Sequence, residues 1–227
     1  MNKRHLKDII EWDVINWSKA IEFWSNRIEL KNKNYSCLEL GGRRGGLSLW
    51  LALEGNGIVC SDLDLPGVDA IELHRKYNME THVTYASIDA TNIPFKDYFD
   101  IVIFKSILGG ISRNNNHELK KKTIDQIYKS LDKGGKVLFA ENLEGSFLHR
   151  WLRKNFIGWG KEWNYLKLQD VPALFSSFTK INYITVGFWG AFGRTEKQRT
   201  YLGKLDCFCE KIIPSSMHYI VIGIAEK

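Results

Sequence analysis

Residues Tyr35–Leu53 read YSCLELGGRRGGLSLWLAL and combine three local patterns in one run. The apolar segment Ser36–Leu40 predicts a buried strand, and Leu47–Leu53 predicts an apolar helix. Four glycines stand between them within six residues: Gly41, Gly42, Gly45 and Gly46. Glycine adopts positive φ without strain, and the N-terminus of a helix offers free N–H groups to an anionic ligand. A plain strand–helix connection, the alternative interpretation, needs only one or two glycines.

The segments that follow alternate between strand and helix patterns. The predicted strands are Ile58–Ser61, Val83–Ile88, Phe99–Lys105 and Lys136–Ala140, and the predicted helices are Asp69–Tyr77 and Glu118–Leu131. Such alternation predicts an α/β fold with a parallel sheet and right-handed crossovers. Ligands of these sheets bind at the carboxyl ends of the strands. We therefore expect the glycine turn and the residues after each strand to form one crevice.

Charged side chains occupy those strand ends. Asp62, Asp89, Lys105 and Glu141 each end or directly follow a predicted strand. An acid at the end of the second strand can accept hydrogen bonds from ribose hydroxyls, and Asp62 is the better candidate for this. Asp64 could instead cap the next helix.

The two ends of the chain complete this picture. Residues 5–30 predict an amphipathic helix that is broken near Asp13, and its apolar stripe favours packing on the core over closure on a ligand. Ile181–Phe188 and His218–Ala225 predict two final strands. Residues 187–193, between these strands, are rich in glycine and aromatic residues and predict a tight loop near the site, and Arg194–Ile213 predicts a pair of mostly polar helices.

From Tyr35 to Asn142 the chain resembles the class I S-adenosylmethionine-dependent methyltransferases. The resemblance rests on the order of several segments: ELGGRRGG at 39–46, Asp62, Asp89-Ala90, IPFKDYFDIVIFKSIL at 93–108 and LDKGGKVLFAEN at 131–142. Arg43 stands where the family has its middle glycine, and Lys133 stands where it has a proline. The resemblance implies a Rossmann-like, doubly wound, seven-stranded and mostly parallel sheet with a C-terminal antiparallel hairpin and an N-terminal helix.

The resemblance also implies a cofactor, S-adenosyl-L-methionine, with S-adenosyl-L-homocysteine as product. The residues expected to bind it are Glu39, Gly41, Gly42, Arg43, Gly45, Asp62, Leu63, Asp89, Ala90 and Lys105. Arg43 either points into solvent or holds a carboxylate of the cofactor or of an acidic substrate. A nicotinamide cofactor is disfavoured, because its fingerprint needs a glycine at the position of Arg43.

The catalytic chemistry has no compact motif. Methyl transfer depends largely on positioning, and a hydroxyl acceptor also benefits from a general base. The expected catalytic residues are Glu141, at the end of the fifth strand, and His149, which begins the next segment; His117 and His218 are further available bases. The Pro-Pro signature of amino-methylating relatives is missing after the fourth strand, where the chain reads KSILGG, and this disfavours methylation of DNA bases or glutamine.

The net charge of +6 is concentrated in the last third of the chain. Residues 145–227 contain 12 Lys+Arg and 6 Asp+Glu, whereas residues 1–144 contain 20 of each. Within residues 145–168 basic side chains alternate with aromatic ones, including Trp159 and Lys161. This pattern leaves three interpretations open: packing on the sheet, a substrate lid that meets an acidic group, or a surface for a membrane or RNA.

Length and composition limit the remaining possibilities. A chain of 227 residues with 44% hydrophobic residues is typical of a soluble domain. We expect a single methyltransferase domain over 1–227, with a helical cap at 1–32 and a substrate lid at 145–180. The four cysteines are too scattered for a disulfide framework and predict no metal site. With no bilayer-spanning run and no signal peptide, we expect a cytoplasmic protein.

These observations predict a methyltransferase that acts on an oxygen of a small acceptor, which is sugar-like or acidic and either free or lipid-linked. The alternatives are an RNA methyltransferase, which the basic last third favours, and a non-catalytic binding protein of the same fold, which Arg43 and the missing motif favour. The sequence leaves the acceptor and the oligomeric state open.

Overall fold

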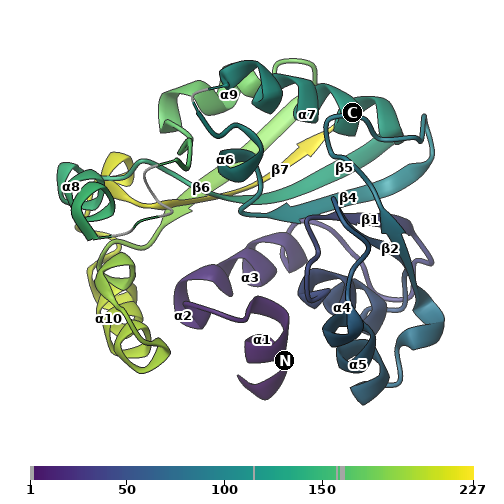
Figure 1. The fold of residues 1–227 in the computed structure, drawn as a ribbon, viewed down its shortest axis with the longest axis horizontal. Helices are drawn as coiled ribbons and strands as arrows, with labels where there is room; N and C mark the ends of the chain where they lie inside the picture. The colour runs from purple at the N-terminus through teal and green to yellow at the C-terminus, as the bar shows by residue number, and fades with distance from the viewer. Residues whose placement is uncertain (1–2, 115, 157, 159–161) are drawn as a thin grey trace.

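A computed structural model describes residues 3–114, 116–156, 158 and 162–227, and its centre is one seven-stranded sheet (Figure 1). The strands are β1 (Ser36–Leu40), β2 (Gly57–Asp62), β3 (Val83–Ser87), β4 (Phe99–Lys105), β5 (Leu131–Asn142), β6 (Lys180–Val186) and β7 (Ile220–Glu226). Their order across the sheet is β3-β2-β1-β4-β5-β7-β6. The first five are mutually parallel, and β7 runs antiparallel to both β5 and β6. The predicted fold class is therefore confirmed.

Helices cover both faces of this sheet. One face carries α1 (Lys3–Ile10), α2 (Val14–Trp17), α3 (Lys19–Ser25), α4 (Gly46–Leu53) and α5 (Val68–Lys76), and the other carries α6 (Leu108–Ile111), α7 (His117–Ser130) and α9 (Val171–Leu174) (Figure 1). Two helices, α8 (Phe147–Phe156) and α10 (Glu196–Cys209), lie at one end of the molecule. Single turns complete the fold: η1 (Glu80–His82), η3 (Leu168–Asp170), η4 (Trp189–Phe192) and η5 (Ser215–Met217).

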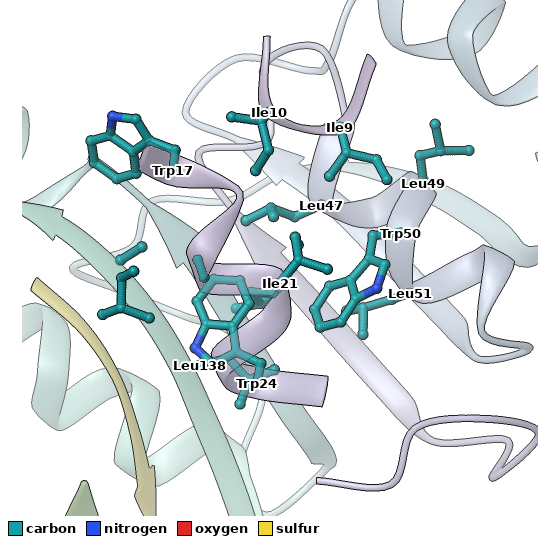
Figure 2. Packing of buried hydrophobic residues seen from close by; sticks show 14 of the residues in the cluster. Ile9, Ile10, Trp17, Ile21, Trp24, Leu47, Leu49, Trp50, Leu51 and Leu138 are labelled. Atoms are coloured by element: carbon teal, nitrogen blue, oxygen red, sulfur yellow. The ribbon is translucent and has the colours of Figure 1, made fainter. Parts of the chain in front are cut away.

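Two tryptophans of the N-terminal segment lie in the core, and the third lies at the candidate site. Trp17 and Trp24 are fully buried, and Trp24 stacks on Trp50 of α4 with 5.7 Å between ring centroids (Figure 2). The Trp24 indole N–H donates to the Gly223 carbonyl at 2.9 Å, which ties α3 to β7. The predicted packing role is therefore correct for these two side chains. Trp12 is only half-buried and faces the cavity described below.

Several predicted boundaries differ from the structure. The predicted break near Asp13 is found at Glu11–Asp13, where Glu11 and Asp13 adopt positive φ of 71° and 46°, but a second division at Ser18 makes the N-terminal segment three helices. The predicted helix pair at Arg194–Ile213 is one helix, α10, because the hydrogen-bonded turns after Cys209 do not extend it. The fifth strand, predicted at Lys136–Ala140, is longer and begins at Leu131, and its pairing with β4 shifts register between Phe99 and Ile101.

Among the described residues, no helix is long and apolar enough to cross a membrane. Cys37 and Cys60 are buried in β1 and β2, whereas Cys207 is exposed. Two residues of the basic-aromatic segment, Trp159 and Lys161, lie outside the described residues.

Candidate functional site

A cavity of about 510 Å³ lies at the carboxyl ends of β1, β4 and β5. Backbone and side chains from many parts of the fold line it: the glycine turn, the N-terminal segment, the ends of β4 and β5, α8 and the segment after it, the η4 loop, α10 and the residue just before β7. The ends of β1, β4 and β5 thus share one cavity, as expected, whereas the residues after β2 and β3 do not line it. The cavity therefore joins the glycine turn to residues from the last third of the chain.

The glycine turn forms one wall of the cavity. Gly41 has a φ of 67° and is exposed at the cavity, so the backbone there is open to a ligand. Gly46 is required for a different reason, because a Cβ at this position would collide with the carbonyl group of Ile9. The N-terminal segment thus packs directly on the turn.

Glu39 supports this turn from below. Its carboxylate accepts hydrogen bonds from the backbone N–H of Ser48, at 2.8 Å, and from the Ser48 hydroxyl, so it caps the first turn of α4. The side chain is buried and reaches the cavity. Burial raises the pKa of Glu39 to about 7, and the hydrogen bonds from Ser48 oppose this shift.

Arg43 and Asp62 connect the turn to the end of β2. The backbone N–H of Arg43 donates to Oδ2 of Asp62 at 3.1 Å, and that of Leu63 donates to Oδ1 at 2.7 Å. A carboxylate oxygen has two lone pairs, so each can accept a further hydrogen bond. Arg43 is exposed and also lines the cavity, so both interpretations of its side chain remain compatible with its place.

The other predicted cofactor residues lie further along the sheet edge. Asp62 ends β2 and Leu63 follows it, Asp89 and Ala90 lie after β3, and none of the four lines the cavity. Asp89 is exposed and accepts the backbone N–H of Thr91 at 2.8 Å. Leu63 is a large apolar side chain that faces solvent. The structure thus brings Gly41, Gly42, Arg43, Glu39 and Lys105 together in the cavity, whereas the other five predicted residues, which are these four and Gly45, do not line it.

Lys105 anchors the N-terminal segment over the cavity. Its Nζ donates to the Ile10 carbonyl at 2.6 Å and lies 5.0 Å from the centre of the Trp12 ring. Burial lowers the pKa of Lys105 to about 8, and the carboxylates of Glu11, Glu39 and Asp13 oppose the shift. The segment at Ile9–Asp13 therefore covers the site as well as packing on the core.

A buried polar network forms the opposite wall. Asp13 accepts hydrogen bonds from the Tyr219 hydroxyl and, at 3.3 Å, from the amide of Asn16. The same amide donates to Asp206 of α10 at 2.8 Å. Asp206 in turn accepts the backbone N–H groups of Phe188, Trp189 and Gly190, at 2.7 to 2.9 Å, and so shapes the η4 loop.

Asp13 and Tyr219 both reach the cavity. Burial raises the pKa of Asp13 to about 7, whereas hydrogen bonds from Tyr219 and Asn16 lower it. Burial and the Asp13 carboxylate hold the pKa of Tyr219 well above its ordinary value. The tyrosine therefore acts as a hydrogen-bond donor to the carboxylate.

Two arginines complete the lining. The Arg153 guanidinium lies 3.9 Å from the centre of the Tyr165 ring and donates to the Leu143 carbonyl at 2.8 Å. Arg199 of α10 lies 6.0 Å from the centre of the Trp12 ring. Together with Lys105 they give this part of the cavity three cationic side chains.

The structure assigns Glu141 and His149 to hydrogen bonds within the fold. Glu141 is fully buried, and its oxygens accept the backbone N–H groups of Ile107, Leu108 and Asn142 at 2.8 to 2.9 Å. Burial raises its pKa to about 7, against the effect of these three donors. His149 is also fully buried, with Nε2 2.8 Å from the Phe188 carbonyl oxygen. Neither belongs to the described residues that line the cavity.

Sequence reasoning did not select Asp13, Tyr219 and Arg199 as site residues. Asp13 was visible only as a break in an apolar pattern, and Tyr219 only as part of an apolar strand. No spacing rule relates these residues, because they come from the first and last parts of the chain. The concentration of basic residues after residue 144 was the one usable signal for Arg153 and Arg199.

Among the described residues, no group of three metal-ligating side chains is found.

Comparison with family models identifies residues 38–139 as a match to the family described as "Methyltransferase domain". No curated protein matches the chain. Solved structures match it over most of its length at low identity. One is phosphoethanolamine N-methyltransferase 2 of Haemonchus contortus in complex with S-adenosyl-L-methionine, at 19% identity and a TM-score of 0.63. The match covers 93% of this chain and 52% of that one, so this chain spans about half the length of that enzyme.

Two further structures have the same fold with different activities in their names. Geranyl diphosphate C-methyltransferase from Streptomyces coelicolor A3(2), in complex with Mg²⁺, geranyl diphosphate and S-adenosyl-L-homocysteine, is 13% identical with a TM-score of 0.65, covering 92% of this chain and 78% of that one. The [4+2]-cyclase SpnF is 15% identical with a TM-score of 0.63, covering 92% and 80%. At such identities the likeness concerns the fold alone, and the activity has to be argued from the site.

Proposed function

We propose, from the premise that residues 38–139 match the family described as "Methyltransferase domain", that the chain is a class I, S-adenosylmethionine-dependent methyltransferase that methylates a small anionic acceptor. The donor is S-adenosyl-L-methionine, and S-adenosyl-L-homocysteine is the product. The acceptor atom is an oxygen of a sugar-like or acidic compound, which can be lipid-linked. We place this reaction in the cytoplasm, and we assign residues 145–180 as the substrate lid.

One observation carries the proposal: a single cavity joins the glycine turn to three cationic side chains, Lys105, Arg153 and Arg199. A methyl donor and its acceptor must meet within one enclosed space, because the transfer is an in-line displacement between them. A phosphate or carboxylate on the acceptor would form charge-assisted hydrogen bonds with the arginines. Trp12, Trp163 and Tyr165 line the same cavity and offer aromatic surfaces to a ring or sugar.

The residues beside the turn fit the donor. The exposed backbone at Gly41 leaves room for a close approach, and each oxygen of Asp62 keeps capacity for a ribose hydroxyl. The solvent-facing Leu63 offers an apolar surface that an adenine ring would cover. When bound, the sulfonium centre of the donor supplies an electrophilic methyl group. The part of the chain that holds it is the turn at 41–46 with Asp62 and Leu63.

Asp13 is the side chain we assign as general base in place of Glu141 and His149. It lines the cavity, and its raised pKa of about 7 lets the carboxylate accept a proton near neutral pH. Tyr219 and Asn16 fix its two oxygens. Glu141 and His149 are engaged by backbone groups inside the fold.

Calorimetry with S-adenosyl-L-methionine and S-adenosyl-L-homocysteine tests donor binding in the intact chain. We expect both to bind, and the folded protein binding neither would contradict the proposal. A second measurement then screens phosphorylated and carboxylated hydroxy compounds for transfer of a labelled methyl group. Release of S-adenosyl-L-homocysteine only in their presence would support an anionic acceptor.

A non-catalytic or non-methylating role is the second candidate, favoured by the cyclase that shares this fold. Binding of the donor without turnover on any acceptor of either class would support it. An RNA methyltransferase remains the third, and affinity for RNA in a salt titration separates it from the others.

A further inference from the structure

The apolar stripe of α10 faces away from the protein. Tyr201, Leu205, Phe208 and Ile212 follow one another at spacings of four, three and four residues, which places the first three along one side of the helix and Ile212 in the turn that follows it. All four are exposed, with Phe208 at 81% and Ile212 at 78%. A stripe of this kind normally faces the core. Here no described part of the chain covers it.

The opposite side of α10 makes the contacts with the fold. Gly203 lies against Ile15, so closely that a Cβ would stand 2.8 Å from the Ile15 Cβ. The acids of the helix point the same way: Asp206 is buried against the η4 loop, and Glu196 accepts the backbone N–H of Asp13 at 2.9 Å. Just beyond the helix, Glu210 pairs with Lys19 at 2.8 Å. The acidic side chains of α10 and of the turn after it therefore lie on the inner side of the helix, against the fold.

Exposed lysines flank the outer stripe. Lys197, Lys204 and Lys211 are spaced seven residues apart, so they form a row beside the apolar residues. The outer side of α10 is consequently apolar along its middle and positively charged along one border. Lysine side chains can extend their ammonium groups toward polar headgroups while their methylene groups contact apolar surface.

Helix α8 repeats the arrangement. Phe147 and Trp151 are 68% and 51% exposed, and Arg150 and Lys154 are exposed beside them. The inner side holds the buried His149 and Arg153. The two helices lie at the same end of the molecule (Figure 1), and the Arg194 guanidinium, just before α10, lies 5.9 Å from the centre of the Phe156 ring of α8.

We propose that the outer sides of α8 and α10 form a docking surface for a bilayer of anionic phospholipids. Amphipathic helices with aromatic residues on one side and Lys/Arg along the border bind in the plane of the membrane interface. The opposite charges of such a lipid surface and of this basic border attract each other. The whole net charge of +6 lies in residues 145–227, which contain both helices.

Two other occupants fit this surface less well. A second copy of the chain would set one row of lysines against another, and like charges repel. RNA would pair with the lysines, but Leu148, Leu205 and Ile212 cannot stack on bases as aromatic side chains do. The inner sides of the same helices contribute Arg153 and Arg199 to the cavity, so docking would hold the cavity beside the membrane.

Co-sedimentation of the intact chain with vesicles tests this surface without any methyl donor. One set of vesicles consists of phosphatidylcholine, and the other of phosphatidylcholine mixed with phosphatidylglycerol. We expect binding to the anionic vesicles, at least roughly tenfold stronger than to the neutral ones and weakened by salt. The variants Phe208→Glu and Trp151→Glu each lower this binding, and together they abolish it. Lys204→Glu lowers it roughly tenfold.

Two matched variants control for general effects of the substitutions. Val68→Glu places a charge on an apolar side chain that is 66% exposed on α5, and Lys133→Glu reverses an exposed charge in β5. Neither should change vesicle binding. The proposal would be overturned if a control variant lost as much vesicle binding as the test variants. It would also be overturned if the double variant Phe208→Glu/Trp151→Glu bound vesicles as the wild type does, or if the wild type bound neutral and anionic vesicles equally. A dimer seen by analytical ultracentrifugation and dissociated by Phe208→Glu would point to a second copy of the chain instead. Binding of RNA that the same variants abolish, with vesicle binding unchanged, would point to RNA, and either result would overturn the proposal. Failure here leaves the methyl-donor calorimetry unaffected.

Discussion

The hydroxyl of Tyr219 donates a hydrogen bond to the carboxylate of Asp13, across 206 positions of the chain. The bond joins the break between α1 and α2 to the residue just before β7. Asn16 links the same carboxylate to Asp206, which holds the η4 loop. The wall of the cavity is thus assembled from the two ends of the chain.

The pair of Asp13 and Tyr219 predicts a shift in the pH dependence of activity. A base with a pKa of about 7 gives a rate that rises as the pH increases through 7. Tyr219→Phe removes a hydrogen bond that lowers this pKa, so the rising limb should move to higher pH. Asp13→Asn should lower kcat by roughly 10²- to 10⁴-fold and remove the limb. The pH profile of kcat/KM measures both, and an unchanged limb in Tyr219→Phe would argue against the assignment.

Asp62 and Asp64 form a natural pair for testing the donor site. Asp62→Ala should weaken binding of S-adenosyl-L-methionine by about 1.5–3 kcal/mol, the contribution of a hydrogen bond to a charged group. Asp64 is exposed and lies two residues on, so Asp64→Ala should leave the affinity unchanged. Isothermal titration calorimetry gives both values. Equal affinities for the two variants would show that Asp62 does not hold the ribose.

Substitutions of Trp24 and Trp12 should distinguish a role in stability from a role in ligand binding. Trp24 is fully buried, stacks on Trp50 and donates a hydrogen bond to β7, so Trp24→Ala should lower the free energy of unfolding by about 3–5 kcal/mol. Trp12 is half-buried beside the cavity, so Trp12→Ala should cost less than half as much stability and should weaken acceptor binding. Urea denaturation provides the comparison. A similar loss of stability in both variants would contradict the division between core and site.

His149 should contribute to stability only while it is neutral. Burial lowers its pKa to about 4, from an ordinary value of 6.5. Because the folded pKa is the lower one, the unfolded chain binds the proton first as the pH falls. The stability that the neutral ring contributes is therefore present above pH 6.5 and is lost between 6.5 and 4, by about 1.4 kcal/mol for each pH unit.

The matched variant is His149→Phe, which keeps an aromatic ring beside Phe188 and Phe192 but cannot take up a proton. Its free energy of unfolding should be lower at pH 7 and should fall less steeply between pH 6.5 and 4. Denaturation curves across this range give the slope, and imidazole NMR gives the pKa directly. A ring that titrates near 6.5 in the folded protein would refute the buried, neutral state.

Local patterns were sufficient for the centre of the sheet. The predicted bounds of β1 and β4, Ser36–Leu40 and Phe99–Lys105, are the observed ones, because their apolar runs end at glycine or charged residues. The C-terminal pair of strands was also predicted, although β6 ends at Val186 and Phe188 belongs to the following loop. Glu141 shows the limit of such reasoning: its position at a strand end was correct, but the direction of its side chain depends on the backbone of Ile107 and Leu108.

The sequence by itself determined the sheet, the glycine turn and the order of the strand ends, because hydrophobic periodicity and glycine act over a few residues. The tertiary structure alone decided what faces the cavity and what faces solvent. Asp13, Tyr219 and Arg199 meet only after the N-terminal segment and α10 have packed together, since burial and contact depend on residues that are distant in the chain. For the same reason the stripe on α10, which its spacing assigns equally well to a core, is found on the outside.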